Sequence, residues 1–138
     1  MLKQYIASTA EGQFRNSLLK EYLGKNVHIE IDRPIGYVHK KEKYSLNYTI
    51  NYGYIPGVLG GDDEELDVYL LGVKEPVNEC DCKIIAAVRR FNDCEDKLVA
   101  CQAGDTYSYS KEEIADAVNF QEKYYHSVII TTIDEIEN

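Results

Sequence analysis

The chain of 138 residues contains 44% apolar residues and carries a formal net charge of −9. This length fits one domain, and the apolar share is enough for a core, which excludes global disorder. The acidic balance lacks the basic face that nucleic-acid binding needs, whereas bound divalent cations would let carboxylates recruit an anionic substrate.

The cysteines and the N-terminus indicate the compartment. The first residues lack the apolar stretch of a signal peptide, and no apolar run is long enough to span a membrane. The four cysteines show no zinc-finger spacing. We therefore expect a cytoplasmic protein with reduced cysteines and no membrane contact.

The N-terminal part of the chain predicts one short helix. Apolar residues recur at a spacing of about 3.6 over residues 13–23, and Gly24 is a suitable residue to end a helix. We assign residues 1–25 to an N-terminal extension that carries this helix and packs on the outside of the domain or on a partner subunit.

The rest of the chain, residues 26–138, is predicted to form one barrel domain. Alternating apolar residues predict a strand over 26–31, the basic stretch 36–44 a loop or hairpin, and 46–55 a second strand that Pro56-Gly57 ends. Further strands are expected at 66–73, 82–91, 97–103 and 127–133, with a frayed tail after them.

A capping box at Ser110 and Glu113 starts a second helix, which we expect to run to about Tyr125. Short strands with few helices between them favour a mainly β fold with flanking helices, built as a small antiparallel barrel. A parallel βαβ sheet would need a helix between successive strands.

Five carboxylates crowd into six residues after two glycines, at Asp62, Asp63, Glu64, Glu65 and Asp67. Their charge alone favours a solvated loop, because repulsion between exposed charges is screened. However, Asp67 lies inside the apolar run LDVYLL, where a loop charge is not expected. The glycines also let the backbone fold tightly, so that several carboxylates can converge.

A second acidic turn contains Asp93, Glu95 and Asp96 and is followed by Lys97. Two acidic strand ends can meet at the same mouth of a barrel. Hard oxygen ligands from two such segments suit Mg²⁺, which also retains water and substrate phosphate.

The run NYGYIPG followed by DDEELDV resembles the signature of the soluble family I inorganic pyrophosphatases. The family pattern is Asn-Tyr-Gly-Tyr/Phe-Ile and then Asp-x-Asp-x-x-Asp-Val. The segments HIEI, KLVA and FQEKYY are similar to flanking family motifs, in the right order over about residues 26–126. The chain thus resembles a short, divergent member. This resemblance implies an OB-like barrel, a homo-oligomer and hydrolysis of pyrophosphate with Mg²⁺, for which Mn²⁺ can substitute.

The resemblance also implies metal ligands and catalytic residues. Glu64 stands where the family has the aspartate that activates a metal-bound hydroxide. Tyr52 matches a tyrosine near the nucleophile, and Lys97 matches a lysine that contacts phosphate. The implied metal ligands are Asp62, Asp67, Asp93, Glu95 and Asp96, the last as a substitute for Glu95 because the register of the turn is uncertain.

Substrate binding is implied for four further residues. Lys40 stands where the family has an arginine, Lys41 and Arg33 are further cations of the shortened loop, and Tyr124 matches a phosphate-holding tyrosine. Tyr125 replaces a family lysine, so that cation is lost. We therefore also consider a metal- or phosphate-binding protein with little turnover, and a hydrolase of a larger diphosphate such as a nucleotide.

Overall fold

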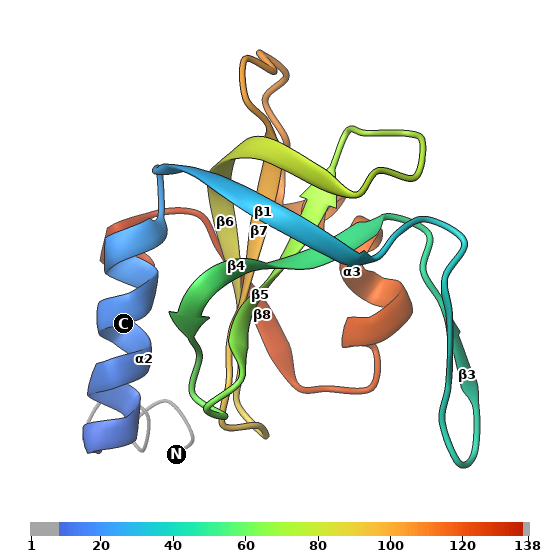
Figure 1. Cartoon of the computed structure of the whole chain (residues 1–138). Coiled ribbons are helices and arrows are strands. Elements are labelled where there is room, and N and C mark those ends of the chain that lie inside the picture. Colours follow the sequence, from blue (N-terminus) through green and yellow to red (C-terminus); the bar gives the residue numbers. More distant parts are fainter. Residues whose placement is uncertain (1–8, 137–138) are drawn as a thin grey trace.

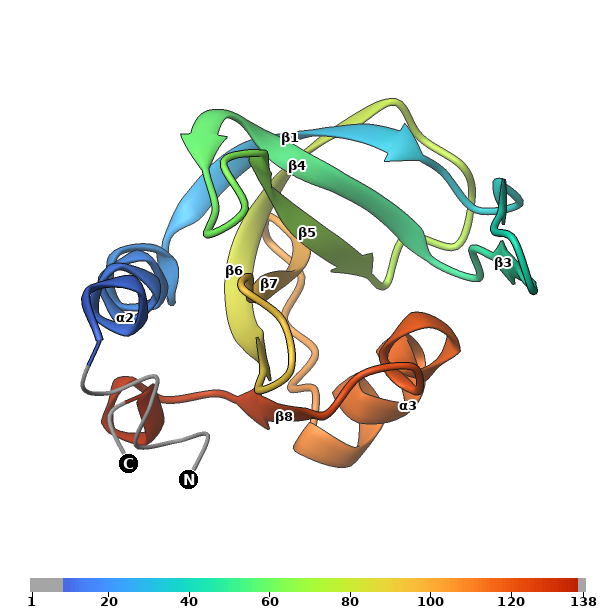
Figure 2. The same ribbon diagram turned by 90° about the horizontal axis from the view of Figure 1, so that it is seen from below.

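Five strands close into a barrel in the computed structural model, which describes residues 9–136 (Figures 1 and 2). Around the barrel they are β1 (Asn26–Arg33), β4 (Asn51–Leu59), β5 (Glu65–Leu71), β7 (Lys97–Gln102) and β6 (Glu79–Arg90). The barrel closes because β6 also pairs with β1. Beyond the barrel, the far end of β6 pairs with β8 (Ser127–Ile130). The predicted small barrel is thus confirmed.

The pair β5–β7 is parallel, whereas the other barrel pairs are antiparallel. The connection between β5 and β7 contains strand β6 and no helix. The sequence therefore lacks the helix between strands by which we would have predicted a parallel pair. In this parallel register Val68 lies beside Leu98. Asp67 and Lys97, one residue earlier in each strand, therefore come together.

Strands β5 and β7 are buried on both faces, which explains why their sequences are almost continuously apolar. Val68 and Leu98 belong to one core cluster, together with Ile29 and Ile84. A second cluster lies on the opposite face, where Tyr69 packs with Ile114 and Val118 of a helix. It also contains Tyr48, Tyr52, Leu71, Ala86, Val88 and Val99. Asp67 and Lys97 share this second face because side chains alternate along a strand.

The predicted strand 46–55 proved to be parts of two strands. β3 (Ser45–Asn47) pairs with β2 (Val38–Lys40) in the hairpin that extends from one side of the barrel, and β4 begins only at Asn51 (Figure 1). Pro56-Gly57 does not end β4, which continues to Leu59. The register with β5 is irregular there, and prolines are tolerated in strands at such positions.

Two α-helices flank the barrel, α2 (Ala10–Tyr22) and α3 (Lys111–Glu122). The capping box that starts α3 is confirmed, although α3 ends at Glu122, before the predicted Tyr125. Helix α2 begins three residues before its predicted start, because Thr9 accepts a hydrogen bond from the backbone of Gly12.

The chain after β8 differs from the prediction in its described part. The strand ends at Ile130, and a 3₁₀ helix, η1 (Ile133–Ile136), replaces the frayed tail. The carboxylate of Glu135 accepts hydrogen bonds from the backbone and hydroxyls of Thr131 and Thr132 and also pairs with Lys111. The last two residues of the predicted tail lie outside the described residues.

Helix α2 shares the core of the barrel. Its Leu19 is 1% exposed and packs in the same cluster as Ile29 and Ile84. The division of the chain at residue 25 stays a prediction, and residues 1–8 of that segment lie outside the described residues. Within residues 9–136, no helix is both long and apolar enough to cross a membrane.

We expect Leu19→Ala to lower the free energy of unfolding by roughly 2–5 kcal/mol, because it removes buried contacts and leaves a cavity. The neighbouring Leu18 is only half-buried, so Leu18→Ala should cost about 1 kcal/mol or less. Urea unfolding of both variants measures the difference. Equal, small losses would mean that α2 does not stabilise the barrel.

Candidate active site

Lys97 joins two acidic segments at the start of β7. Its side-chain nitrogen donates to Oδ2 of Asp67 at 2.6 Å and to Oε1 of Glu95 at 2.5 Å. The residue is only 3% exposed. Burial alone would lower the pKa of the Lys97 ammonium, but Asp67 and Glu95 raise it above its usual value. The ammonium is therefore charged at neutral pH.

Glu95 is the most perturbed carboxylate of this group. Burial and then the neighbouring carboxylate of Asp62 raise the pKa of Glu95 to about 7, although Lys97 opposes the shift. Asp62 itself keeps a lowered pKa, because the contact with Glu95 and a backbone hydrogen bond outweigh its burial. Two carboxylates thus meet beside one ammonium.

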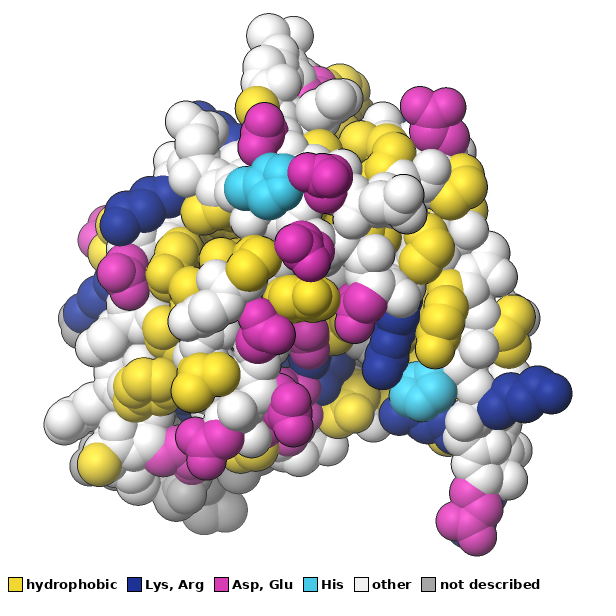
Figure 3. All heavy atoms as spheres, viewed as in Figure 1, with side chains coloured by type: hydrophobic (Ala, Val, Ile, Leu, Met, Phe, Trp, Pro, Cys, Tyr) yellow, Lys and Arg dark blue, Asp and Glu magenta, His cyan; other side chains and the backbone are white. Residues whose placement is uncertain are grey.

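A polar cavity of about 180 Å³ opens beside Asp67, Glu95 and Lys97. Figure 3 shows acidic side chains gathered on this side of the molecule next to lysine and arginine side chains. The cavity is lined by Asp32, Arg33, His39, Lys41, Tyr52, Asp67, Arg90, Glu95, Lys97, Gln121 and Tyr125. Acidic and basic groups therefore face the same small space.

Six of the predicted site residues line this cavity: Arg33, Lys41, Tyr52, Asp67, Glu95 and Lys97. Asp62 does not line it but contacts Glu95 from the acidic loop. The prediction that two acidic segments meet at the barrel is thus confirmed by the contacts of Glu95 with Asp62 and of Lys97 with Asp67.

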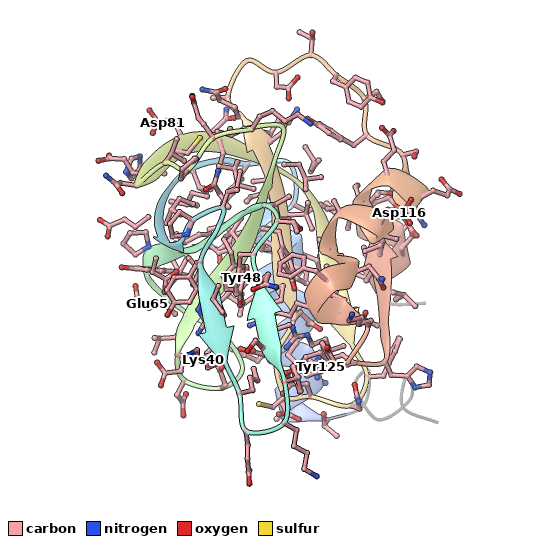
Figure 4. The ribbon with its side chains drawn as sticks, turned by 90° about the vertical axis from the view of Figure 1, so that its right-hand side faces the viewer. Lys40, Tyr48, Glu65, Asp81, Asp116 and Tyr125 are labelled. Atoms are coloured by element: carbon pink, nitrogen blue, oxygen red, sulfur yellow. The ribbon has the colours of Figure 1, made fainter. Side chains whose placement is uncertain are left out.

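Three other predicted residues lie away from the cavity. Glu64 is exposed in the turn before β5, and Lys40 is exposed on β2, at the label in Figure 4. Tyr124 is 42% exposed and stacks on Tyr44 of the hairpin, with ring centroids 4.2 Å apart. The family-implied roles of these residues stay predictions that the geometry does not support.

The other acidic side chains of the turn point to arginines. Oδ2 of Asp93 accepts a hydrogen bond from Arg90 at 2.9 Å. Asp96 is buried and pairs with Arg15 of α2 and Arg89 of β6. The structure thus favours Glu95 over Asp96 as the carboxylate of this turn that faces the cavity.

Asp32 was not predicted from the sequence, because a regular strand that places Arg33 at the site would turn Asp32 to the opposite face. Neighbours on a regular strand point to opposite faces, yet Asp32 and Arg33 both line the cavity. The register between β1 and β4 shifts between Ile31 and Arg33, and such a bulge redirects side chains. The adjacent Pro34 was the only signal in the sequence of an irregular strand end.

Arg90 was also missed, although it supplies a cation near the position of the lost lysine. Its guanidinium carbon lies 3.6 Å from the ring centre of Tyr125, and it pairs with Glu122 of α3 at 2.6 Å. Figure 4 shows Tyr125 after the end of α3. The arginine reaches this place from β6, so no local motif reveals it.

His39 of β2 lines the cavity with one ring nitrogen free. Its Nδ1 is buried and has no hydrogen-bond partner within residues 9–136. Burial, and then the charges of Arg33 and Lys41, lower the pKa of His39. The imidazole is therefore neutral at neutral pH. No motif surrounds His39 in the sequence, so its place at the cavity could not be predicted.

The two acidic segments approach each other closely at Gly61. A side chain at this glycine would place its Cβ 2.0 Å from the carbonyl oxygen of Cys94. At the neighbouring Gly60, the nearest atom to such a Cβ is 3.6 Å away. The absence of a side chain at Gly61 is therefore what lets the loop of Asp62 lie against the turn of Glu95.

We expect Gly61→Ala to destabilise the protein by roughly 1–3 kcal/mol, because the new methyl group overlaps backbone atoms that must move. Gly60→Ala is the matched control and should change the unfolding free energy by about 0.5 kcal/mol or less. Thermal unfolding of the two variants compares them. A larger loss for Gly60→Ala would contradict this account of the loop.

The fold and the cavity together define a class of protein, a closed five-stranded barrel that carries an acidic and basic pocket on its outer face. The sequence profile described as "Inorganic pyrophosphatase" matches residues 22–133. The chain therefore belongs to the inorganic pyrophosphatase family.

Solved structures confirm the OB-like fold of that family. An inorganic pyrophosphatase from Ehrlichia chaffeensis is 14% identical with a TM-score of 0.61, and the alignment covers 84% of this chain and 94% of the other. One from Neisseria gonorrhoeae is 17% identical, with a TM-score of 0.55 and coverage of 83% and 86%. One from Helicobacter pylori is 16% identical, with a TM-score of 0.54 and coverage of 82% and 90%.

The acidic side chains at the cavity are of the type that binds a hard divalent cation such as Mg²⁺. Within residues 9–136, no three His, Cys, Asp or Glu side chains are close enough to form a complete metal cage. The acidic groups that face the cavity, Asp32, Asp67 and Glu95, are hard oxygen donors. Mg²⁺ needs only one or two carboxylates when water and substrate phosphates complete its shell.

Proposed function

We propose that this protein hydrolyses inorganic pyrophosphate to two phosphates in a Mg²⁺-dependent reaction, for which Mn²⁺ can substitute. The observation that carries the proposal is the cavity in which Asp67, Glu95 and Lys97 lie beside Arg33 and Lys41. Phosphoryl transfer depends mainly on positioning and on neutralising charge, and this cavity offers groups for both. Membership of the pyrophosphatase family supports the same reaction.

Asp67 is the first candidate for holding the metal, with Asp32 and Glu95 beside it. The metal ion, when bound, lowers the pKa of a water molecule and neutralises phosphate charge. Lys97 already orients Asp67 and Glu95 through its two hydrogen bonds. Its fixed ammonium also gives the cavity a permanent positive charge.

Arg33 and Lys41 are the cations best placed to bind phosphate. Within residues 9–136 neither forms an ion pair, although both line the cavity. Arg33 is held by a hydrogen bond of 2.6 Å to the hydroxyl of Tyr48, and its guanidinium lies 5.8 Å from the ring centre of Tyr52. A guanidinium fixed in this way can offer its remaining N–H groups to phosphate oxygens.

Tyr52 acts as a hydrogen-bond donor in this proposal. Burial, and then the charge of Asp67, raise the pKa of Tyr52 well above its usual value. The hydroxyl therefore stays protonated at neutral pH. It lies among Asp67, Gln121 and Lys97, where a neutral donor can stabilise an oxygen that gains negative charge.

The position of Glu64 favours a second candidate function. Glu64, the base that the resemblance implies, is exposed and lies outside the cavity, so the cavity lacks this particular carboxylate. A protein with such a site would bind metal and phosphate with reduced or little turnover. Binding of Mg²⁺ and phosphate without hydrolysis of any diphosphate would decide for this alternative.

The size of the cavity argues against a larger substrate. Pockets for drug-sized ligands usually occupy about 300–1,000 Å³, whereas this one measures about 180 Å³. It therefore suits pyrophosphate better than a nucleotide.

We further propose that the protein is a cytoplasmic homo-oligomer without nucleic-acid partners. Size-exclusion chromatography with light scattering tests the oligomeric state.

We expect Asp67→Asn to lower Mg²⁺-dependent phosphate release from pyrophosphate by at least about 100-fold, because it removes a charge from the reacting centre. Asp63→Asn is the matched control, since Asp63 is exposed and lies outside the cavity, and its rate should change less than about twofold. A titration of Mg²⁺ against the initial rate measures both. No release by the wild type, or equal release by wild type and Asp67→Asn, would overturn the proposal.

We expect Arg33→Lys to raise the KM for pyrophosphate about tenfold, because lysine keeps the charge but loses the planar fork that binds phosphate oxygens. Lys40→Ala serves as the control, since Lys40 is exposed and does not line the cavity, and its KM should stay within about twofold. Steady-state kinetics at saturating Mg²⁺ gives both values. A larger effect at Lys40 would restore the role that the sequence resemblance assigns to it.

A further inference from the structure

We propose that Arg15 of helix α2 is a positioning residue for the reaction, because it holds the acidic turn 91–96 so that Glu95 and Lys97 face the cavity. The inference rests on the proposed function. It assigns a role in catalysis to a helix that lies almost wholly before the matched family region, which starts at residue 22.

The side chain of Arg15 is bound to the turn through all of its nitrogen atoms. Its Nε and Nη2 donate to the two carboxylate oxygens of Asp96 at 3.1 and 2.5 Å. Nη1 donates to the backbone oxygen of Asp93 at 2.9 Å, and Nη2 also donates to that of Arg90 at 2.6 Å. These contacts grip the start, the middle and the end of the turn.

Asp96 is the acceptor on which these contacts converge. It also accepts hydrogen bonds from Nη2 of Arg89 at 3.0 Å and from the backbone nitrogen of Arg90 at 3.1 Å. Arg89 in turn donates to Oδ1 of Asn16 at 2.6 Å, which gives α2 a second tie to the same turn. Both carboxylate oxygens of Asp96 are therefore occupied, so Asp96 fixes the turn and does not serve as a metal ligand.

Asp96 determines the positions of the residues on either side of it. Glu95 and Lys97 flank Asp96 in the chain, and their side chains bond to each other on the cavity side. A rotation of the Asp96 backbone would displace both of them together. Since a misplacement of about 1 Å can cost on the order of 100-fold in rate, the fixed turn matters for catalysis.

Burial makes this clamp rigid and also sensitive to substitution. Arg15 is 2% exposed and Asp96 is 5% exposed. Removing one member of a buried ion pair leaves the other uncompensated and costs roughly 3–5 kcal/mol. Arg15→Ala therefore carries a risk of unfolding, whereas Arg15→Lys keeps the charge and loses only the fork that reaches several acceptors at once.

The test compares Arg15→Lys and Arg15→Ala with Gln13→Ala, an exposed control on the same helix. Pyrophosphate hydrolysis is measured at saturating Mg²⁺, at a temperature where circular dichroism shows each variant folded. We expect kcat to fall about tenfold in Arg15→Lys, and further in Arg15→Ala if it folds, while KM changes less than about twofold. Gln13→Ala should match the wild type.

Three results would overturn the inference. An unchanged kcat in a variant with a lowered unfolding temperature would show that Arg15 only stabilises the fold. A rise in KM without a fall in kcat would place its effect on substrate binding, and an equal loss in Gln13→Ala would show a general effect of the helix. An inactive wild type is distinguishable from all three, because it overturns the proposed function itself.

Discussion

The ion pairs of Lys97 are the interaction on which the site depends. A buried ammonium is costly unless carboxylates compensate it, and Asp67 and Glu95 do so from two separate segments. The parallel register of β5 and β7 brings Asp67 to Lys97, and the turn before β7 brings Glu95. The acidic loop and the acidic turn are thereby held at one edge of the barrel.

A second set of hydrogen bonds connects two cations of the cavity through the interior. Arg33 donates to Tyr48, and the chain continues through two neighbouring residues of α3 and Tyr69 to Arg90. Hydrogen bonds with donor–acceptor distances of 2.6–2.7 Å join Tyr48 to Gln121, Gln121 to Tyr69, Tyr69 to Glu122 and Glu122 to Arg90. Helix α3 therefore fixes the basic side of the cavity, as α2 fixes the turn on its acidic side.

Much of the fold and part of the site could be predicted from local sequence. Asp67 stood out because a charge interrupts an apolar strand, and this strand is buried on both faces. Asp32 and Arg90 could not be found in this way. A register shift redirects Asp32, and Arg90 meets Tyr125 only because β6 and the end of α3 lie side by side in the fold. Equally, nothing local shows that Asp96 faces an arginine 81 residues away.

The charges of the cavity give a physical reason for a divalent cation there. Burial and then the carboxylate of Asp62 raise the pKa of Glu95 to about 7, and burial and then Asp67 raise the pKa of Asp32. Both shifts mean that the protein's own cations do not fully stabilise the ionised carboxylates. Arg90 and Lys97 are already bound to carboxylates, and Arg33 is held by Tyr48. A divalent cation beside Asp67, as the proposed function requires, would add positive charge to the acidic side of the cavity.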